Sequence, residues 1–311
     1  MSNRDFIILM ILSFMWSLSF IFYRVGVPEF GSLAFASLRV VLAGLTMLVF
    51  VLISPKNRAG IRDNWKVLTL VGLFSAAIPF ILFAFSARSV NAGVLAVLNA
   101  SVPMMSGFIA STFFKDRLSK KQIIGLIIGV IGVIILMSEN LFGGSGQGAE
   151  SGSGLQPMGY ALLACVGYAV GANITRNYLY DVSPVAITAG SLIIASIIML
   201  PIAVYEFPYG KTISLTAWTS VICIGVFSTA IALIFMNQLI KSIGPMRATS
   251  ITLVIPIFAI ILGYLLLGEA LDTPAIIGSV VILFGTYLSL ELSIKKMMKS
   301  LRLTLNWSAV F

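Results

Sequence analysis

Runs of about 20 apolar residues recur along the whole chain, and each is long enough to cross a hydrocarbon core roughly 30 Å thick. The charge content agrees, because 59% of the residues are hydrophobic and only 10% are charged, whereas a soluble domain is usually about 25% charged. The runs show no strand-like alternation, so we expect helices and not the strands of a barrel. The sequence therefore predicts an all-α integral membrane protein.

The apolar runs define ten predicted spans. Their bounds are 6–23, 33–53, 64–86, 91–113, 120–138, 158–176, 185–205, 215–239, 245–267 and 274–292. The first run follows Arg4 and superficially resembles a signal peptide, but it extends to Tyr23 and no A-x-A-like cleavage site follows it. We therefore expect a permanent helix there.

Residues 88–137 and 241–290 share a pattern at an offset of 153 residues. The shared positions are a proline within an apolar run, an acid at its far end and a glycine in the next run: Pro103 with Pro256, Asp116 with Glu269, and Gly125 with Gly278. A similar match at an offset of 152 pairs Trp16 with Tyr168 and Arg24 with Arg176. The chain is therefore predicted to contain two copies of one unit.

Glycine and serine dominate the segment between the two copies, and such a composition is typical of a flexible linker. The predicted organisation is a first unit 1–141, an external linker 142–157, a second unit 158–292 and a basic cytoplasmic tail 293–311. Five spans per unit is an odd number, so the second unit would enter the membrane inverted. Ten transmembrane helices as two inverted five-helix repeats would place a shared site near the midplane.

The net charge of +9 is distributed unevenly between the predicted loops. If the N-terminus is cytoplasmic, sixteen Lys and Arg residues lie on the inner side, only Arg24, Arg88 and Lys211 lie on the outer side, and Arg39 lies within a span. This bias predicts a multi-pass protein of the cell (inner) membrane with both termini in the cytoplasm. It also assigns the basic excess to orientation and to contact with membrane lipids, not to nucleic acid.

Arg39 is the one full charge well inside a predicted span. A central arginine costs roughly 2.5–3.5 kcal/mol to insert and is rarely left facing lipid. Arg39 lies about six residues, or roughly 9 Å, from the outer end of its span, which would permit snorkelling. Two roles remain open: a structural or gating arginine that faces the bundle, or a direct contact with an anionic substrate group.

The prolines Pro79, Pro103 and Pro256, each within an apolar run, are the candidates for shaping a cavity. Proline removes a helical hydrogen bond and frees carbonyl groups that can line a cavity. Asn99 and Thr252 precede the second and third prolines by one turn, so the two helices are predicted to meet at a central site. The alternative is that the prolines only bend helices for packing.

Aromatic side chains near mid-span are further candidates for this site. Trp16 is flanked by hydroxyl residues, and because interfacial tryptophan is commoner than central tryptophan, a cavity role and a packing role both remain open. Phe83 and Tyr168 are predicted to line the same cavity. Cys165 and Cys223 show no metal or redox spacing, and the chain contains no histidine, so we expect neither a metal nor a cofactor.

Small residues and turn acids predict how the spans pack and end. Gly125 and Gly129 form a G-x-x-x-G face, which allows close helix packing within the protein or between protomers, so a monomer and a homodimer both remain open. The acids Asp116, Glu269 and Asp272 are expected near the N-terminus of the helix that follows each of them.

The chain resembles the EamA-type transporters of the drug/metabolite transporter superfamily. The resemblance is carried by Met15-Trp16-Ser17, by Ala36-Ser37-Leu38-Arg39 and by the repeated pattern from Pro103 to Gly125 and from Pro256 to Gly278. Trp16-Ser17 and Lys115-Asp116 depart from the Trp-Gly and Gly-Glu that are frequent in the family, which prevents placement in a subfamily. The resemblance implies ten helices in two inverted units, a central cavity, and export or exchange of amino acids, other metabolites or drugs.

These observations favour a secondary transporter that moves a small organic solute by alternating access. The predicted cavity residues are Trp16, Arg39, Phe83, Asn99, Tyr168 and Thr252. All eleven acids lie in loops or at helix ends, which favours exchange or facilitated diffusion over a mid-membrane carboxylate relay. A non-transporting receptor or scaffold remains an alternative. An intramembrane enzyme is disfavoured because histidine, a G-x-S-x-G elbow, paired intramembrane aspartates and a phosphate-binding loop are missing.

Overall fold

The structure is a computed structural model that describes residues 3–114, 118–138, 155–243 and 251–290. Asp116, most of the predicted linker 142–157 and the predicted tail 293–311 lie outside the described residues. We call the described residues up to 138 the first half and those from 155 onward the second half.

Every regular element within these residues is a helix. The first half contains α1 (Asn3–Phe30), α2 (Ser32–Leu52), α3 (Pro55–Asp63), α4 (Trp65–Gly72), the π-helical η1 (Leu73–Ala77), α5 (Ile78–Ser86), α6 (Ala92–Asn99), α7 (Val102–Phe113) and α8 (Lys120–Leu136). The second half contains α10 (Leu155–Tyr178), α11 (Pro184–Tyr205), α12 (Leu215–Gly225), the π-helical η2 (Val226–Ile231), α13 (Ala232–Ile243), α15 (Ile251–Leu267) and α16 (Thr273–Ser289).

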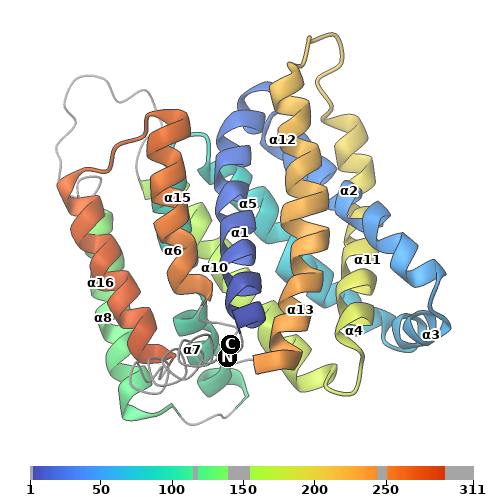
Figure 1. Cartoon of the computed structure of the whole chain (residues 1–311), viewed down its shortest axis with the longest axis horizontal. Coiled ribbons are helices and arrows are strands. Elements are labelled where there is room, and N and C mark those ends of the chain that lie inside the picture. The colour runs from blue at the N-terminus through green and yellow to red at the C-terminus, as the bar shows by residue number, and fades with distance from the viewer. Residues whose placement is uncertain (1–2, 115–117, 139–154, 244–250, 291–311) are drawn as a thin grey trace, which may run out of the picture.

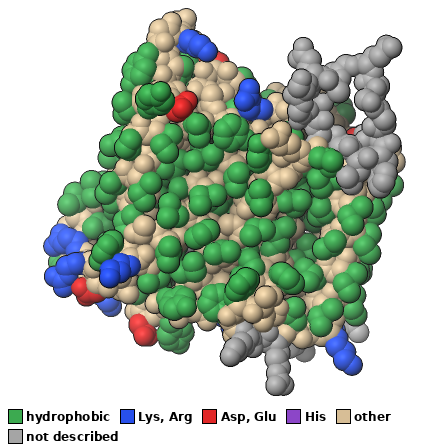
Figure 2. Space-filling view, turned by 180° about the vertical axis from the view of Figure 1, so that it is seen from behind, with side chains coloured by type: hydrophobic (Ala, Val, Ile, Leu, Met, Phe, Trp, Pro, Cys, Tyr) green, Lys and Arg blue, Asp and Glu red, His purple; other side chains and the backbone are tan. Residues whose placement is uncertain are grey.

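Seven helical stretches are long and apolar enough to cross a membrane, and α15 and α16 are shorter apolar helices of 17 residues each. Hydrophobic side chains cover the middle of one face of the molecule, and charged side chains lie toward its edges (Figure 2). The predicted all-α, multi-pass membrane protein is confirmed.

Two of the predicted spans are interrupted beside a proline. The ring of proline clashes with the carbonyl group four residues earlier and leaves it without a hydrogen bond. For Pro79 this is the carbonyl of Ser75, which lies in η1. For Pro103 it is the carbonyl of Asn99, where α6 ends before α7 begins. By contrast, Pro256 lies inside the continuous helix α15.

The two π-helical segments lie at corresponding positions of the two halves. Leu73 begins η1 and Val226 begins η2, so they are separated by the 153 residues of the predicted repeat. Both continue with Phe-Ser, at Phe74 and Phe227. No proline follows η2; there, the hydroxyl of Thr229 donates to the carbonyl of Ile224 at 2.7 Å. A side chain that bonds into the helical ladder in this way locally widens the turn.

The helices alternate in direction across the bundle (Figure 1). Because α1 begins and α16 ends at the same end of the molecule, the lower one in Figure 1, we call this the near end and the opposite one the far end. The helix α1 lies at the centre, where it contacts α15 and α12. On one side α8 packs along α16, and on the other side α2 packs along α11.

Glycines allow α8 and α16 to approach each other very closely. A Cβ atom added to Gly125 would lie 2.6 Å from the carbonyl oxygen of Gly285, and one added to Gly278 would lie 2.6 Å from the backbone nitrogen of Leu136. Backbone cannot move aside as a side-chain tip can. The prediction that the G-x-x-x-G face serves close packing is confirmed, and the packing joins the two halves of this chain.

Candidate functional site

The side chain of Arg39 is buried at the centre of the bundle, with 6% of its surface exposed. Its Nε donates to the hydroxyl oxygen of Thr229 in η2 at 3.0 Å, and its Nη1 donates to the hydroxyl oxygen of Tyr23 in α1 at 2.7 Å. No carboxylate pairs with Arg39 among the described residues. Hydroxyl groups therefore take the place of the acid that the sequence lacks inside its spans.

The guanidinium of Arg39 also lies over an aromatic ring. Its Cζ is 3.5 Å from the ring centroid of Phe80 in α5, and the hydroxyl of Tyr23 donates to the carbonyl oxygen of Phe80 at 3.1 Å. A cation held over a ring is stabilised by the negative face of the π system. Arg39 therefore faces the bundle and does not snorkel. Its Nη2 has no hydrogen bond with the described residues, so a contact with substrate stays open beside the structural role.

Two further predicted site residues are joined to this arginine through Phe80. The rings of Phe83 and Tyr168 stack with centroids 5.9 Å apart, and the ring of Phe80 contacts Tyr168 edge-on at 6.2 Å. The structure thus brings together Arg39, Phe83 and Tyr168 from α2, α5 and α10. The sequence analysis did not single out Tyr23, Phe80 or Thr229 as site residues. The available signal was a hydroxyl or an aromatic ring within a span, the kind of partner that a buried arginine without an acid requires.

Trp16, Tyr168 and Asn99 are partly exposed although each lies among buried residues. Trp16 is on the face of α1 that carries the buried Leu12, Phe20 and Tyr23, because residues three, four and seven positions apart share a helix face. Tyr168 lies on the buried face of α10, and Asn99 follows seven consecutive buried residues of α6. Their exposed surface is therefore directed into the bundle and not toward lipid.

The polar groups of these three residues make no hydrogen bond with the described part of the chain. They are the indole N–H of Trp16, the amide of Asn99 and the hydroxyl of Tyr168. An unpaired polar group costs several kcal/mol in a hydrocarbon interior. Groups of this kind are stable where water or a polar solute reaches them. No hydrogen bond or ring contact among the described residues joins Trp16 or Asn99 to the cluster of Arg39, Phe83 and Tyr168, so a shared solute site stays a prediction.

Thr252 and the three prolines lie on the helices that surround this region. Thr252 is partly exposed on the face of α15 that also carries the buried Ile255 and Ala259. Pro79 is buried against α10, where a Cβ atom on Gly167 would lie 3.0 Å from its ring. Pro256 is buried within α15, and Pro103 is partly exposed at the start of α7. Their predicted roles in substrate binding and in cavity shape remain predictions.

A separate surface pocket of about 380 Å³ lies between α3 and the turn from α10 to α11. Its polar lining residues are Lys56, Asn64, Asn177, Tyr180, Asp181 and Ser183. None of the predicted site residues lines it. The central aromatic and arginine cluster, and not this pocket, is therefore the candidate site.

The turn acids behave differently from one another. The prediction for Asp272 is confirmed, because its Oδ1 accepts from the backbone N–H of Ala275 at 2.7 Å and caps α16. The prediction for Glu269 is wrong, because its Oε2 accepts from the backbone N–H of Ala92 at 2.7 Å, at the start of α6 in the other half. Gly268 (φ 67°) ends α15 in an αL motif, in which its N–H donates to the carbonyl of Tyr264 at 3.2 Å.

A profile of the EamA-like transporter family matches residues 5–138 and 156–290. The chain belongs to the EamA-like transporter family. The family resemblance predicted from the sequence, within the drug/metabolite transporter superfamily, is therefore confirmed.

Relatives of this EamA-like chain include several proteins named as transporters. An "Uncharacterized transporter" of Archaeoglobus fulgidus is 22% identical over 92% of this chain and 98% of its own length. The "Uncharacterized inner membrane transporter YedA" of Escherichia coli strain K12 is 28% identical over 88% of this chain and 86% of its own length. The "Probable amino-acid metabolite efflux pump" of Salmonella typhimurium is 25% identical over 93% and 95%.

A solved crystal structure superimposes on the EamA-like chain with a TM-score of 0.63. The alignment covers 93% of this chain and 98% of that one, at 13% sequence identity. At this identity the likeness establishes a shared fold.

Proposed function

We propose that this protein is a secondary transporter that moves a small organic solute across the cell (inner) membrane by alternating access. In this proposal ten spans form two inverted five-helix repeats, residues 1–141 and 158–292, with an external linker, a cytoplasmic tail and both termini inside. Support comes from the family model, which matches each half of the chain separately. It also comes from η1 and η2, which begin 153 residues apart, the offset of the predicted repeat. A third support is that α1 begins and α16 ends at the same end of the molecule.

One observation carries the proposal. Trp16, Asn99 and Tyr168, from α1, α6 and α10, carry polar groups that make no hydrogen bond with the described residues and lie on helices in the interior of a membrane protein. A purely structural interior would pair these groups or replace them with apolar ones. Together with Nη2 of Arg39 they provide hydrogen-bond donors, and the rings of Phe83 and Tyr168 provide an apolar surface. This chemistry suits an amino acid or a drug-like solute with a polar head.

The proposed direction is outward, as an exporter or exchanger, in keeping with the printed name of the Salmonella typhimurium relative. The proposed energy source is the solute gradient or exchange. Arg39, the charge at the centre of the site, is held by hydroxyl groups and a ring, and none of its described partners can release or accept a proton at ordinary pH.

Counterflow in proteoliposomes tests the proposal. The purified protein is reconstituted, the vesicles are loaded with one unlabelled solute from a panel of amino acids and organic cations, and uptake of the same radiolabelled solute is measured. We expect transient accumulation for at least one solute, which empty vesicles do not show. A protein that incorporates normally but gives no counterflow with any solute would act as a receptor or scaffold and would contradict the proposal.

A pair of tyrosine variants locates the site. Tyr168→Phe removes an unpaired hydroxyl and should change the half-saturating solute concentration several-fold, since a hydrogen bond contributes about 0.5–1.5 kcal/mol. Tyr178→Phe is the matched control, because Tyr178 lies on the same helix and is 63% exposed. Equal kinetics for the two variants would remove Tyr168 from the site.

A further inference from the structure

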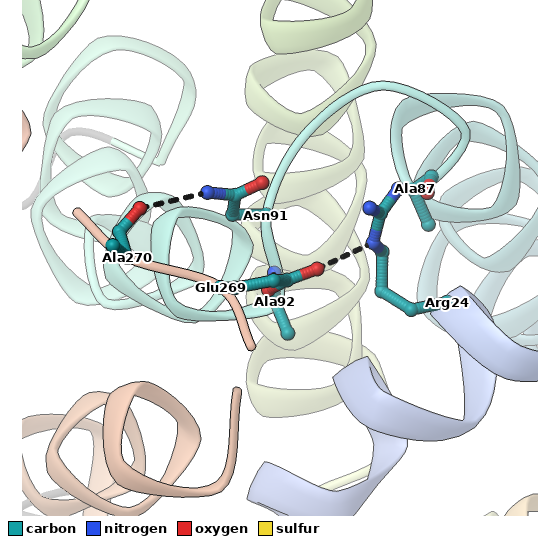
Figure 3. A network of polar contacts seen from close by, with 6 residues as sticks. All are labelled: Arg24, Ala87, Asn91, Ala92, Glu269 and Ala270. Atoms are coloured by element: carbon teal, nitrogen blue, oxygen red, sulfur yellow. Dashed lines mark hydrogen bonds and ion pairs between the residues drawn. The ribbon is translucent and has the colours of Figure 1, made fainter. Parts of the chain in front are cut away.

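At the far end a carboxylate of the second half is held by two groups of the first half (Figure 3). Arg24, near the end of α1, donates from Nε to Glu269 Oε1 at 2.6 Å, and the backbone N–H of Ala92 donates to Oε2 at 2.7 Å. Beside them, Nδ2 of Asn91 donates to the carbonyl oxygen of Ala270 at 3.3 Å. We call these three contacts the latch. The side chain of Glu269 is 9% exposed and that of Arg24 is 26% exposed, so the ion pair is partly shielded from water.

Arg24 has a second partner within its own half, and Asn91 occupies a position from which it can gain one. Arg24 also donates from Nη1 to the carbonyl oxygen of Ala87 at 2.8 Å. Asn91 is the N-cap residue of α6 but makes no cap bond there, because its amide is directed to Ala270. Asparagine is among the best N-cap residues. If Glu269 left, Asn91 could therefore turn and cap another N–H in the first turn of α6.

Several other helix starts are capped by their own N-cap side chain, and this includes α12, whose N-cap Ser214 also donates to Glu29 of the first half. Ser119 caps α8 and Asp272 caps α16, each from its own N-cap position. The start of α6 differs from these because its N-cap side chain makes no cap bond and a carboxylate of the opposite half binds the N–H of Ala92. An element with two comparable arrangements is what a conformational switch requires.

The latch is connected to the candidate site through α1. Arg24 follows Tyr23, whose hydroxyl accepts from Arg39 and donates to the carbonyl of Phe80. Consecutive residues of one helix thus hold the central cluster and the far-end latch. A movement of α1 that accompanies solute binding at Arg39, Phe83 and Tyr168 would act on both.

We propose that Arg24 and Glu269 are gating residues that hold the far end closed, and that Tyr23 couples their separation to occupancy of the central site. This inference rests on the proposed transport function. In the other state Glu269 leaves, Arg24 keeps its bond to Ala87, and Asn91 caps α6. The gate opens by separation of the two halves.

Cysteine accessibility tests the gate. Ser19 is a suitable reporter position, because it lies one turn from Tyr23 on α1, is 6% exposed and has a hydroxyl without a partner in the described residues. Ser19→Cys is introduced after Cys165→Ala and Cys223→Ser, and a membrane-impermeant thiol reagent is added on either side of the membrane. The far side is identified as the side from which an exposed cysteine in place of Arg88 reacts.

The proposal makes opposite predictions for the two sides. When Arg24→Gln or Glu269→Gln is added to the Ser19→Cys parent, labelling of the reporter thiol from the far side should accelerate about five- to tenfold, and labelling from the near side should slow. Arg24→Lys should lie between these variants and the parent, and Arg88→Gln, the matched control on the same end, should equal the parent. Labelling that accelerates from both sides indicates loosened packing, and unchanged labelling indicates a static contact; either result overturns the gate.

Counterflow of the Ser19→Cys parent separates this inference from the proposed function. A parent that exchanges solute, with variants that show no opposite change in labelling, contradicts the gate alone. A parent that gives no counterflow with any solute contradicts transport itself.

Discussion

The two halves of this protein meet in two very different ways. Between α8 and α16 they meet backbone against backbone, with glycines where no further atom fits. At the far end they meet through the tips of Arg24, Asn91 and Glu269. The glycine contact allows one arrangement. At the latch, Arg24 also binds the carbonyl of Ala87, and Asn91 can turn to cap α6. The comparison indicates a fixed contact about which the halves can turn and a contact that is made and released.

The largest effect is expected for an enlarged side chain in the glycine contact. In Gly125→Leu the new Cβ would lie 2.6 Å from the carbonyl oxygen of Gly285, so backbone must move, which costs about 3 kcal/mol or more. Folded yield and melting temperature in detergent should fall sharply. Gly159→Leu is the control, because a Cβ there meets nothing within 4 Å. Equal stability of both variants would show that α8 and α16 can separate, which would contradict a fixed contact between them.

The next effect concerns Arg39, which lies in the central cluster with Tyr23, Phe80 and Thr229. Arg39→Gln removes the charge over Phe80 and the bonds to Tyr23 and Thr229, so counterflow should fall about tenfold or more. Arg39→Lys should recover only part of the rate, since an ammonium lacks the planar fork of donors. Arg62→Gln, at an exposed position, should match the parent. Unchanged flux in Arg39→Gln at equal expression would assign Arg39 to packing alone.

A smaller change in stability is expected at the latch. Glu269→Gln replaces a partly exposed ion pair, which is worth about 1 kcal/mol or less after screening by solvent. The melting temperature of Glu269→Gln should therefore fall much less below that of the parent than the melting temperature of Gly125→Leu does. If Glu269→Gln lost as much stability as Gly125→Leu, the far-end contact would be as fixed as the contact between α8 and α16. The proposed difference between a fixed and a releasable contact would then be wrong.

The smallest change in stability is expected at Asn99 and Thr252. Asn99→Leu removes an amide that has no hydrogen bond in the described residues, so the melting temperature should hardly change. The half-saturating solute concentration in counterflow should change several-fold for Asn99→Leu and for Thr252→Leu, since both replace polar groups on interior faces. Thr219→Leu, on the exposed side of α12, is the control. Kinetics equal to those of the control would reassign both residues to packing.

The helices and the presence of a close-packing glycine face could be predicted from sequence, because both depend on local signals. Apolar runs set the helices, and the spacing of Gly125 and Gly129 indicated close packing. The same local reasoning explains the cap at Asp272, where the carboxylate binds the next turn. These features need no knowledge of which spans are neighbours.

The contacts between distant spans could not be predicted in the same way. Arg39 and Thr229 are 190 residues apart, and neither span order nor hydropathy indicates that they meet. Glu269 was expected to serve the following helix, but the left-handed turn at Gly268 redirects it to α6. The residues of the site were found by type, since a buried charge and mid-span amides are costly, whereas their partners depend on the three-dimensional arrangement.

The π-helical turns have a consequence for the orientation of the side chains beyond them. One extra residue in a turn rotates the remainder of a helix by about 100° around its axis. The segment η1 precedes Phe80 and Phe83, so it sets the direction in which these two rings point toward Arg39 and Tyr168. The segment η2 contains Thr229 and likewise sets the direction of its hydroxyl toward Arg39. A chain of identical hydropathy with regular helices at both places would present other side chains to the centre of the bundle.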